Sequence, residues 1–183
     1  MTISESEFTL LGDALWLDFI NTARGRGPAP PDLLPDQSAL FRWSALQRLD
    51  LNGGAPAFDL VLQFRERLTA LAEALHAGVQ PPAASIVAIN EQLSLGGGCH
   101  QLTRVSGEWQ LRFAPERRPS ILQAIAQSAA ASLADSLHFV RRCAGEGCSL
   151  FFCDDSPNQS RRWCSMASCG REIKVERRRG LLR

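Results

Sequence analysis

Four cysteines near the C-terminus form two pairs of equal spacing. Cys143 and Cys148 have four residues between them, as do Cys164 and Cys169, and fifteen residues separate the pairs. Two short-spaced pairs across a short loop can bring four thiolates to the corners of one tetrahedron, the geometry that structural Zn²⁺ takes in proteins. Four unrelated core cysteines would not be expected to repeat one spacing. The pattern therefore predicts a structural metal site with Zn²⁺ as its cofactor.

Two further residues fall in register with this site. His138 and Cys153 continue the five-residue spacing of the first pair on either side, so each could compete for the metal. The equal pairing favours the four cysteines of the two pairs as ligands. In that assignment His138 lies on a helix face and Cys153 is a spare thiol near the metal.

The net charge of +1 is unevenly distributed along the chain. Residues 1–139 contain ten arginines against fourteen acidic residues, whereas residues 140–183 contain nine arginines and one lysine against five acidic residues. A basic tail on an acidic body indicates a partner for the tail, with nucleic acid as the leading candidate.

The sequence also bears on the compartment of the protein. No apolar run reaches the roughly 18 residues of a membrane span, and the N-terminal residues do not resemble a secretory signal. We therefore expect a cytoplasmic protein that does not associate with membranes. In a reducing compartment the six cysteines favour metal binding over disulfides.

Apolar periodicity predicts a mainly helical body over residues 1–142. The clearest stripe, which includes Leu60, Phe64 and Leu68, predicts a helix that stops at Gly78. A later helix is expected to be the central packing helix and to run directly into Cys143, so that the metal site is rigidly docked. The expected helices span residues 8–22, 38–49, 57–77, a segment after Pro82, and 119–142.

One segment has strand character instead. Residues 100–113 indicate a β-hairpin with Ser106-Gly107 as a two-residue turn, which sets Leu102 opposite Leu111 and Arg104 opposite Trp109. The predicted fold class is therefore α+β: a mainly helical body with one β-hairpin, followed by a small C-terminal zinc finger and a short basic helix.

Polar side chains inside the apolar N-terminal stretch are candidates for ligand binding. Asp18 and Asn21 lie three positions apart and would share one side of a helix, and Arg24 follows in a loop rich in glycine and proline. They could bind a small polar effector, or they could tie down the loop that follows. The second role is the more common one for buried polar groups.

Residues 143–179 resemble the CGNR-type zinc finger. The resemblance rests on the CxxxxC pair, an aromatic run, Asp-Asp-Ser at 154–156, the string RRWCSM at 161–166 and the dipeptide Cys-Gly at 169–170. The string LWLDFINT at 15–22 is similar to the N-terminal signature of the ABATE domain, behind which this finger is usually found in bacterial proteins.

The resemblance covers essentially the whole chain. It implies an ABATE-like domain over residues 1–142, a CGNR-type finger over residues 143–183, zinc on the four paired cysteines, and a stress-linked transcription regulator. The chain departs from the family where Asn and Arg usually follow Cys-Gly. Arg171 and Glu172 stand there instead, which places a negative charge where relatives carry a positive one.

DNA binding through the basic finger is the function that charge and resemblance favour. The basic side chains expected to contact phosphates are Arg161, Arg162, Arg171, Lys174, Arg177 and Arg178. The alternative is a zinc-stabilised protein–protein interaction module that does not bind nucleic acid. A catalytic zinc keeps an open coordination position, which four thiolates do not leave, so no enzymatic activity is expected. A small-molecule effector and a homodimer stay open as further partners.

Overall fold

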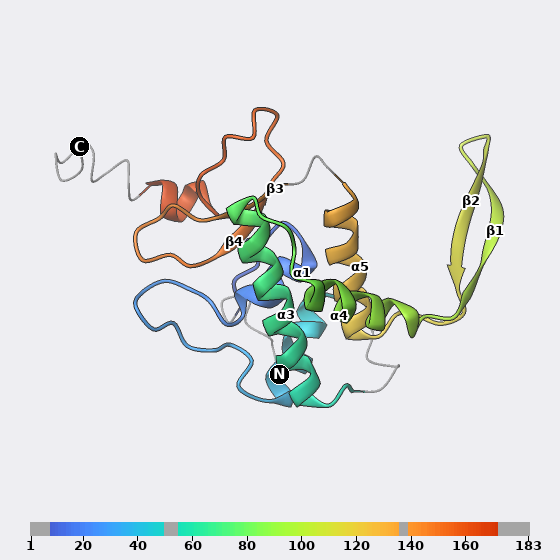
Figure 1. Ribbon diagram of the computed structural model, residues 1–183, viewed down its shortest axis with the longest axis horizontal. Coiled ribbons are helices and arrows are strands. Elements are labelled where there is room, and N and C mark those ends of the chain that lie inside the picture. The colour runs from blue at the N-terminus through green and yellow to red at the C-terminus, as the bar shows by residue number, and fades with distance from the viewer. Residues whose placement is uncertain (1–7, 50–54, 136–138, 172–183) are drawn as a thin grey trace.

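The computed structural model describes residues 8–49, 55–135 and 139–171. Among the described residues, five helices form the body around one core, two antiparallel strand pairs accompany them, and a short π-helical turn ends the described chain (Figure 1). The elements, in chain order, are α1 (Leu15–Asn21), α2 (Gln37–Leu46), α3 (Phe58–Ala77), α4 (Ala83–Ser94), β1 (Gly98–Val105), β2 (Glu108–Pro115), α5 (Ile121–Ala134), β3 (Phe139–Arg142), β4 (Phe151–Asp154) and the π-turn η1 (Met166–Gly170). The predicted α+β class is confirmed; the predicted tail helix lies outside the described residues.

The short helix α1 is central to the core. Trp16 and Phe19 on it are fully buried, and the ring of Phe19 lies 5.5 Å from that of Trp43 on α2. Helices α3 and α5 pack on α1 and contribute buried residues such as Leu68 and Ile125 to the same cluster. Strand β4 also contacts α1. The N-terminal signature therefore lies between the helical body and β4, the strand between the two cysteine pairs.

Local chemistry explains where several helices begin and end. The carboxylate of Asp36 accepts a hydrogen bond from the backbone N–H of Ala39 and caps the start of α2. Helix α3 ends at Gly78, which has a φ of 68°, as predicted. Ser120 and Gln123 form a reciprocal capping box at the start of α5.

The predicted β-hairpin is confirmed in its register. Leu102 pairs with Leu111 and Arg104 with Trp109 across β1 and β2. Ser106 and Gly107 both have positive φ, 51° and 91°, as a two-residue hairpin turn requires. Figure 1 shows this hairpin projecting away from the packed helices.

Two helix predictions are wrong in detail: the start of the N-terminal helix and the orientation of one leucine on α3. The N-terminal helix begins at Leu15 rather than near residue 8, because the chain turns at Asp13, whose φ is 59°. In α3, Leu60 was predicted to face the core, yet 51% of its surface is exposed. It lies in the first turn of the helix, and the buried stripe begins with Val61 and Phe64.

The prediction of one helix from 119 to 142 is wrong. Helix α5 ends at Ala134, and residues 139–142 form strand β3, which pairs with β4 in antiparallel register. Val140 continues the apolar spacing of the helix, but it is buried from a strand. Strand β3 packs on α3, and the N–H of Arg142 donates to Nδ1 of His76 at 3.3 Å. A β-hairpin, not a helix, therefore leads into Cys143.

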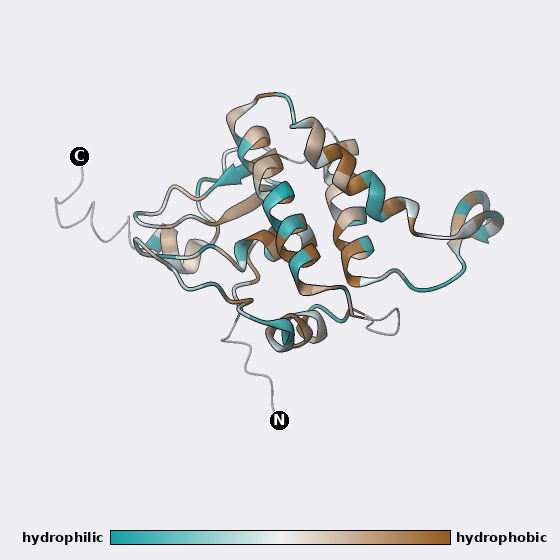
Figure 2. Cartoon of the chain, turned by 60° about the horizontal axis from the view of Figure 1, so that its bottom comes forward, coloured by the Kyte–Doolittle hydropathy of each residue, from teal (hydrophilic) through white to brown (hydrophobic). Residues whose placement is uncertain are grey.

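Within the described part of the chain, no helix combines the length and apolar character needed to cross a membrane. Hydrophobic and hydrophilic residues alternate along the body helices (Figure 2), and buried apolar residues of these helices belong to one core cluster.

Candidate metal centre

The two cysteine pairs converge in space. One Sγ atom from each of Cys143, Cys148, Cys164 and Cys169 lies within 4.8 Å of every other, and all four residues are buried. The Sγ atoms of Cys148 and Cys164 are 4.0 Å apart, and those of Cys164 and Cys169 are 3.7 Å apart. Four tetrahedral thiolates at about 2.3 Å from a Zn²⁺ ion would be separated by about 3.8 Å. The cluster therefore has the donor set and the spacing of a four-thiolate metal site.

The backbone around the cluster supports a thiolate at Cys143. The N–H groups of Gly145 and Cys164 point at its Sγ atom from 3.4 and 3.3 Å. Hydrogen bonds to sulfur stabilise its negative charge in the way that second-shell contacts stabilise metal ligands. Gly145 is also required for space, because a Cβ atom there would lie 2.9 Å from the Sγ atom of Cys169.

Local backbone structure positions three of the four cysteines. Cys143 follows β3 directly, and Cys148 lies two residues before Leu150, whose carbonyl accepts from the N–H of Cys143 at 2.9 Å. Cys169 belongs to η1, whose start is capped by the hydroxyl of Ser165 through the N–H groups of two following residues. Trp163 packs against the cysteine cluster as a partly buried side chain.

The pKa values of three of these thiols, Cys143, Cys148 and Cys164, are shifted within the cluster. Hydrogen bonding from the Cys164 side chain lowers the pKa of Cys143 to about 4. Burial raises the pKa of Cys148 to about 11, and the hydrogen bond to Cys143 raises the pKa of Cys164. One thiolate is therefore favoured, and its neighbours resist deprotonation beside it. A divalent cation resolves this conflict because it binds the thiolates directly and displaces their protons.

The two competing residues do not enter the described cluster. Cys153 is buried among the apolar residues of the body, and its backbone N–H donates to the carbonyl of Gly12 at 2.9 Å. Burial, followed by the nearby carboxylate of Asp155, raises the pKa of the Cys153 thiol to about 11. His138 lies outside the described residues. Among the residues that the structure describes, the two cysteine pairs thus form the group that could hold a metal ion.

The loop after α1 is paired with the first cysteine turn of the finger. Arg26 and Cys148 form an antiparallel bridge, and the N–H of Gly27 donates to the carbonyl of Gly147 at 2.9 Å. Gly25 and Ser149 exchange three further hydrogen bonds, of 2.9 to 3.1 Å. Sequence reasoning missed this contact, because backbone pairing between segments more than 100 residues apart leaves no spacing signal.

Of the three predicted ligand-binding residues, Asn21 and Arg24 contact the finger, whereas Asp18 contacts residues of the body. The side-chain amide of Asn21 donates to the carbonyl of Phe151 at 2.8 Å and accepts from its N–H at 2.9 Å. Asp18 accepts from the N–H of Gly12 at 2.8 Å, and burial raises the pKa of its carboxyl. Arg24 pairs with Glu73 at 2.8 Å and lies over the ring of Phe151. Their polar groups are engaged with the protein itself.

Arg161, predicted to contact DNA, is engaged inside the protein. Its guanidinium donates to the carbonyls of Trp163 and Cys164 at 3.0 and 2.7 Å, and it forms an ion pair with Asp13. The same group lies 4.6 Å from the ring centre of Phe152. The side chain therefore ties the second cysteine pair to the turn that precedes α1; a phosphate contact by Arg161 stays a prediction.

Asp154 organises the polar loop between the two pairs. Its fully buried carboxylate accepts from the N–H and hydroxyl of Ser156, from Nε of Arg141 and from the N–H of Arg161. Burial alone would raise its pKa, but the hydrogen bonds from Ser156 and then Arg141 outweigh burial and hold the pKa below its usual value. The Asp-x-Ser spacing is typical of a side-chain turn, so this role had a sequence signal.

Three exposed arginines lie close to metal ligands along the chain. Arg162 and Arg171 were predicted to contact nucleic acid, and each is two residues from a ligand. Arg142, which the prediction missed, directly precedes Cys143 and is exposed as well. The predicted contacts Lys174, Arg177 and Arg178 lie outside the described residues, as does Glu172.

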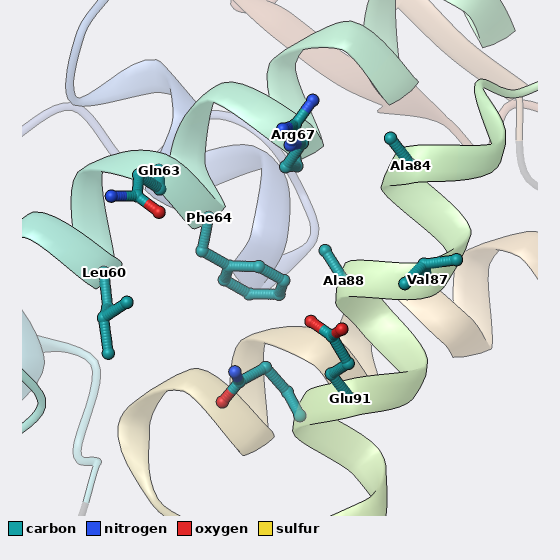
Figure 3. A pocket seen from close by; sticks show the side chains of 9 residues that line it. Leu60, Gln63, Phe64, Arg67, Ala84, Val87, Ala88 and Glu91 are labelled. Atoms are coloured by element: carbon teal, nitrogen blue, oxygen red, sulfur yellow. The ribbon is translucent and has the colours of Figure 1, made fainter.

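Two surface cavities differ in their relation to this centre. A groove of about 350 Å³ between α3 and α4 is lined by residues such as Phe64, Arg67 and Glu91, none of them from the finger (Figure 3). A larger cavity of about 580 Å³ is lined by Arg24, Thr69 and Ser149, among others. The second cavity therefore includes residues of both the body and the finger.

Comparison with protein-family models gives two matches. Residues 13–136 match the ABATE model, described as "Putative stress-induced transcription regulator", and residues 140–180 match the CGNR zinc finger. No curated protein matches the chain. The resemblance drawn from the N-terminal signature and from the finger motif is thereby confirmed. Because the ABATE model covers well over half of the chain and the finger model contains all four clustered cysteines, the chain belongs to the ABATE family with a C-terminal CGNR zinc finger.

Proposed function

We propose that the chain is a transcription regulator whose finger binds Zn²⁺ through the four paired cysteines and binds DNA through basic side chains around that centre. The observation that carries the metal assignment is the mutual approach of four buried Sγ atoms to within 4.8 Å. Thiolates favour zinc among the common metals with tetrahedral coordination, and the distances suit it. Four protein ligands would leave no open position, so the proposal gives the metal a structural role and the chain no catalytic one.

Charge supports DNA as the partner of the finger. Arg142, Arg162 and Arg171 are exposed, and none of them has an ion pair among the described residues. Each lies within two residues of a cysteine ligand, so the metal would fix their backbone positions. The remaining predicted contacts, Lys174, Arg177 and Arg178, follow directly along the chain. Phosphate neutralisation by such side chains provides most of the affinity of non-specific DNA binding.

The test is the salt dependence of binding to mixed-sequence duplex DNA. We expect a steep loss of affinity with salt, and a double variant Arg162→Ala/Arg171→Ala should flatten the slope of log K against log salt by roughly two contacts. Arg67→Ala removes an exposed charge from α3 in the body and serves as the matched control. A salt response that is flat in the wild type contradicts the proposal.

The same exposed arginines also suit an acidic protein partner, which is the alternative function of the finger. That alternative is favoured if the zinc-loaded finger binds no duplex DNA at low salt but still binds an acidic protein. Nucleic acid that co-purifies with the wild-type protein and is lost from the Arg162→Ala/Arg171→Ala variant favours DNA.

We further propose the cavity beside Arg24 as the site for an effector sensed by the ABATE domain. Its support is that Arg24 of the body and Ser149 of the finger line the same space of about 580 Å³, so a bound ligand would contact both. Thr69→Trp should fill the cavity and abolish any thermal stabilisation that a small-molecule screen detects in the wild type. A ligand that stabilises wild type and variant equally binds elsewhere.

A further inference from the structure

The β1–β2 hairpin is structurally separate from the body. Its strands pair with each other, and the described residues provide no third strand. Figure 1 shows the hairpin extending away from the helices, joined to them through α4 and α5. An isolated two-stranded hairpin is marginally stable in water, and such strands usually gain stability by packing one face against another element.

One face of this hairpin is apolar and uncovered. Strand alternation and the pairing register place three cross-strand pairs on it. The four large apolar side chains of this face expose 52% to 69% of their surface. The pairs are His100 with Phe113 at the base, Leu102 with Leu111 in the middle, and Arg104 with Trp109 at the tip.

The opposite face has a different composition. It carries Gln101, Thr103 and Arg112 along its length, with Glu108 near the tip. Alternation of apolar and polar side chains is typical of a strand pair with one face in a core and the other in solvent. In this chain the apolar face has the composition of a buried surface, but within the described residues nothing covers it.

We propose that this apolar face, defined as the side chains of His100, Leu102, Arg104, Trp109, Leu111 and Phe113, is the contact surface of a homodimer. A large side chain has about 150 to 250 Å² to bury, so the exposed fractions correspond to roughly 500 Å² on one copy. Two copies would bury roughly 1,000 Å², which reaches the lower bound for a specific interface before His100 and Arg104 are counted.

The arrangement of side chains on the face is self-complementary, as a two-fold interface requires. When two such faces stack with tips at opposite ends, Trp109 of one copy meets Phe113 of the other. When they stack with tips at the same end, Trp109 meets Arg104 and Phe113 meets His100. In both arrangements leucines meet leucines, and each ring meets a ring or a cationic group, both favourable contacts.

The face is mainly apolar and carries one formal charge, that of Arg104, so apolar contact with a second copy suits it better than pairing with an acidic protein. Arg104 already lies 5.8 Å from the ring centre of Trp109 in its own copy, so its charge has a local partner. No carboxylate occupies the face, since Glu108 lies on the opposite one. The inference does not rest on DNA binding by the finger, and its failure would leave that proposal intact.

The experiment measures the mass of the full zinc-loaded chain by sedimentation velocity from about 1 to 300 µM, the range in which an interface of this size should associate. The test variant is Leu102→Thr/Leu111→Thr, which introduces β-branched residues that suit a strand but removes the apolar middle pair. Its matched control, Thr103→Ser/Gln110→Thr, changes a cross-strand pair on the opposite face. Circular dichroism and zinc content establish that each variant folds.

We expect a reversible dimer in the wild type and the control, and a dissociation constant at least about tenfold higher in the test variant. Chains labelled with donor or acceptor dye at the exposed Cys99 should transfer energy when mixed, and the test variant should not. A wild type that is monomeric throughout the range overturns the proposal. So does a test variant that dimerises like the wild type, or one that loses only binding to duplex DNA.

Discussion

Asn21 offers the sharpest test of how the body holds the finger. Its side-chain amide satisfies both backbone groups of Phe151, as a neighbouring strand would. The amide donates to the carbonyl at 2.8 Å and accepts from the N–H at 2.9 Å, and both residues are buried. Asn21→Leu would leave the N–H and the carbonyl of Phe151 without partners. A buried group left unsatisfied costs about 1–3 kcal/mol, so we expect a loss of about 2–5 kcal/mol, from a total stability of about 5–15 kcal/mol.

The assay is urea unfolding of the zinc-loaded protein, followed by circular dichroism. Ser44→Ala is the matched control, because Ser44 is also fully buried but its hydroxyl only donates to the carbonyl of Leu40 within its own helix. Removing it leaves no orphan group and should cost less than about 1 kcal/mol. Hydrogen exchange at the amide of Phe151 should accelerate in Asn21→Leu alone. A loss below about 0.5 kcal/mol with unchanged exchange would refute the reasoning.

Three further predictions concern the surroundings of the metal. Gly145→Ala should weaken zinc retention against a chelator by at least about tenfold, because its Cβ would lie 2.9 Å from Sγ of Cys169; retention equal to wild type would contradict the close packing. Arg161→Ala should destabilise the finger more than Asp13→Ala does, because Arg161 also binds two backbone carbonyls; equal losses in urea unfolding would reduce its role to the ion pair. The pKa of Asp154 is lowered in the fold, so its ionised carboxylate adds to the free energy of unfolding. This stabilisation is present above the unfolded pKa of about 3.9 and is lost as the pH falls through the folded value. The stability advantage of wild type over Asp154→Asn should therefore be largest near neutral pH and shrink below about pH 4; an advantage independent of pH would argue against a buried carboxylate.

The metal centre was the most predictable part of the molecule. Equal spacing of two cysteine pairs is a local property that reports directly on geometry, and the structure brings all four thiols together. The hairpin register followed from Ser106-Gly107 for the same reason, since a two-residue turn fixes every pair behind it.

The end of α5 shows that apolar periodicity alone does not locate the end of a helix. Val140 fits the apolar spacing of the preceding helix, yet it lies on a strand because β3 pairs with β4 and the two insert Phe151 into the core. That pairing depends on tertiary contacts with α1 and α3, which a single helical pattern cannot report. Asp135, which ends α5, was a weak local signal for the break.

The junction between body and finger was the least predictable part. Gly25 and Ser149 share one backbone–backbone hydrogen bond and two hydrogen bonds of the Ser149 hydroxyl, and a single serine in a sequence does not indicate a partner more than 100 residues away. The polar side chains of the N-terminal signature were visible in the sequence, but Asn21 could be assigned to Phe151 only once both were placed.

The central claim is that four cysteines hold one structural zinc ion within the finger. Metal analysis combined with zinc K-edge X-ray absorption of the purified chain tests it most directly. The account predicts one zinc per chain with four sulfur neighbours at about 2.3 Å, unchanged in Cys153→Ser and lost in Cys164→Ser. A shell of three sulfurs with an oxygen or nitrogen neighbour, or loss of zinc in Cys153→Ser, would contradict it.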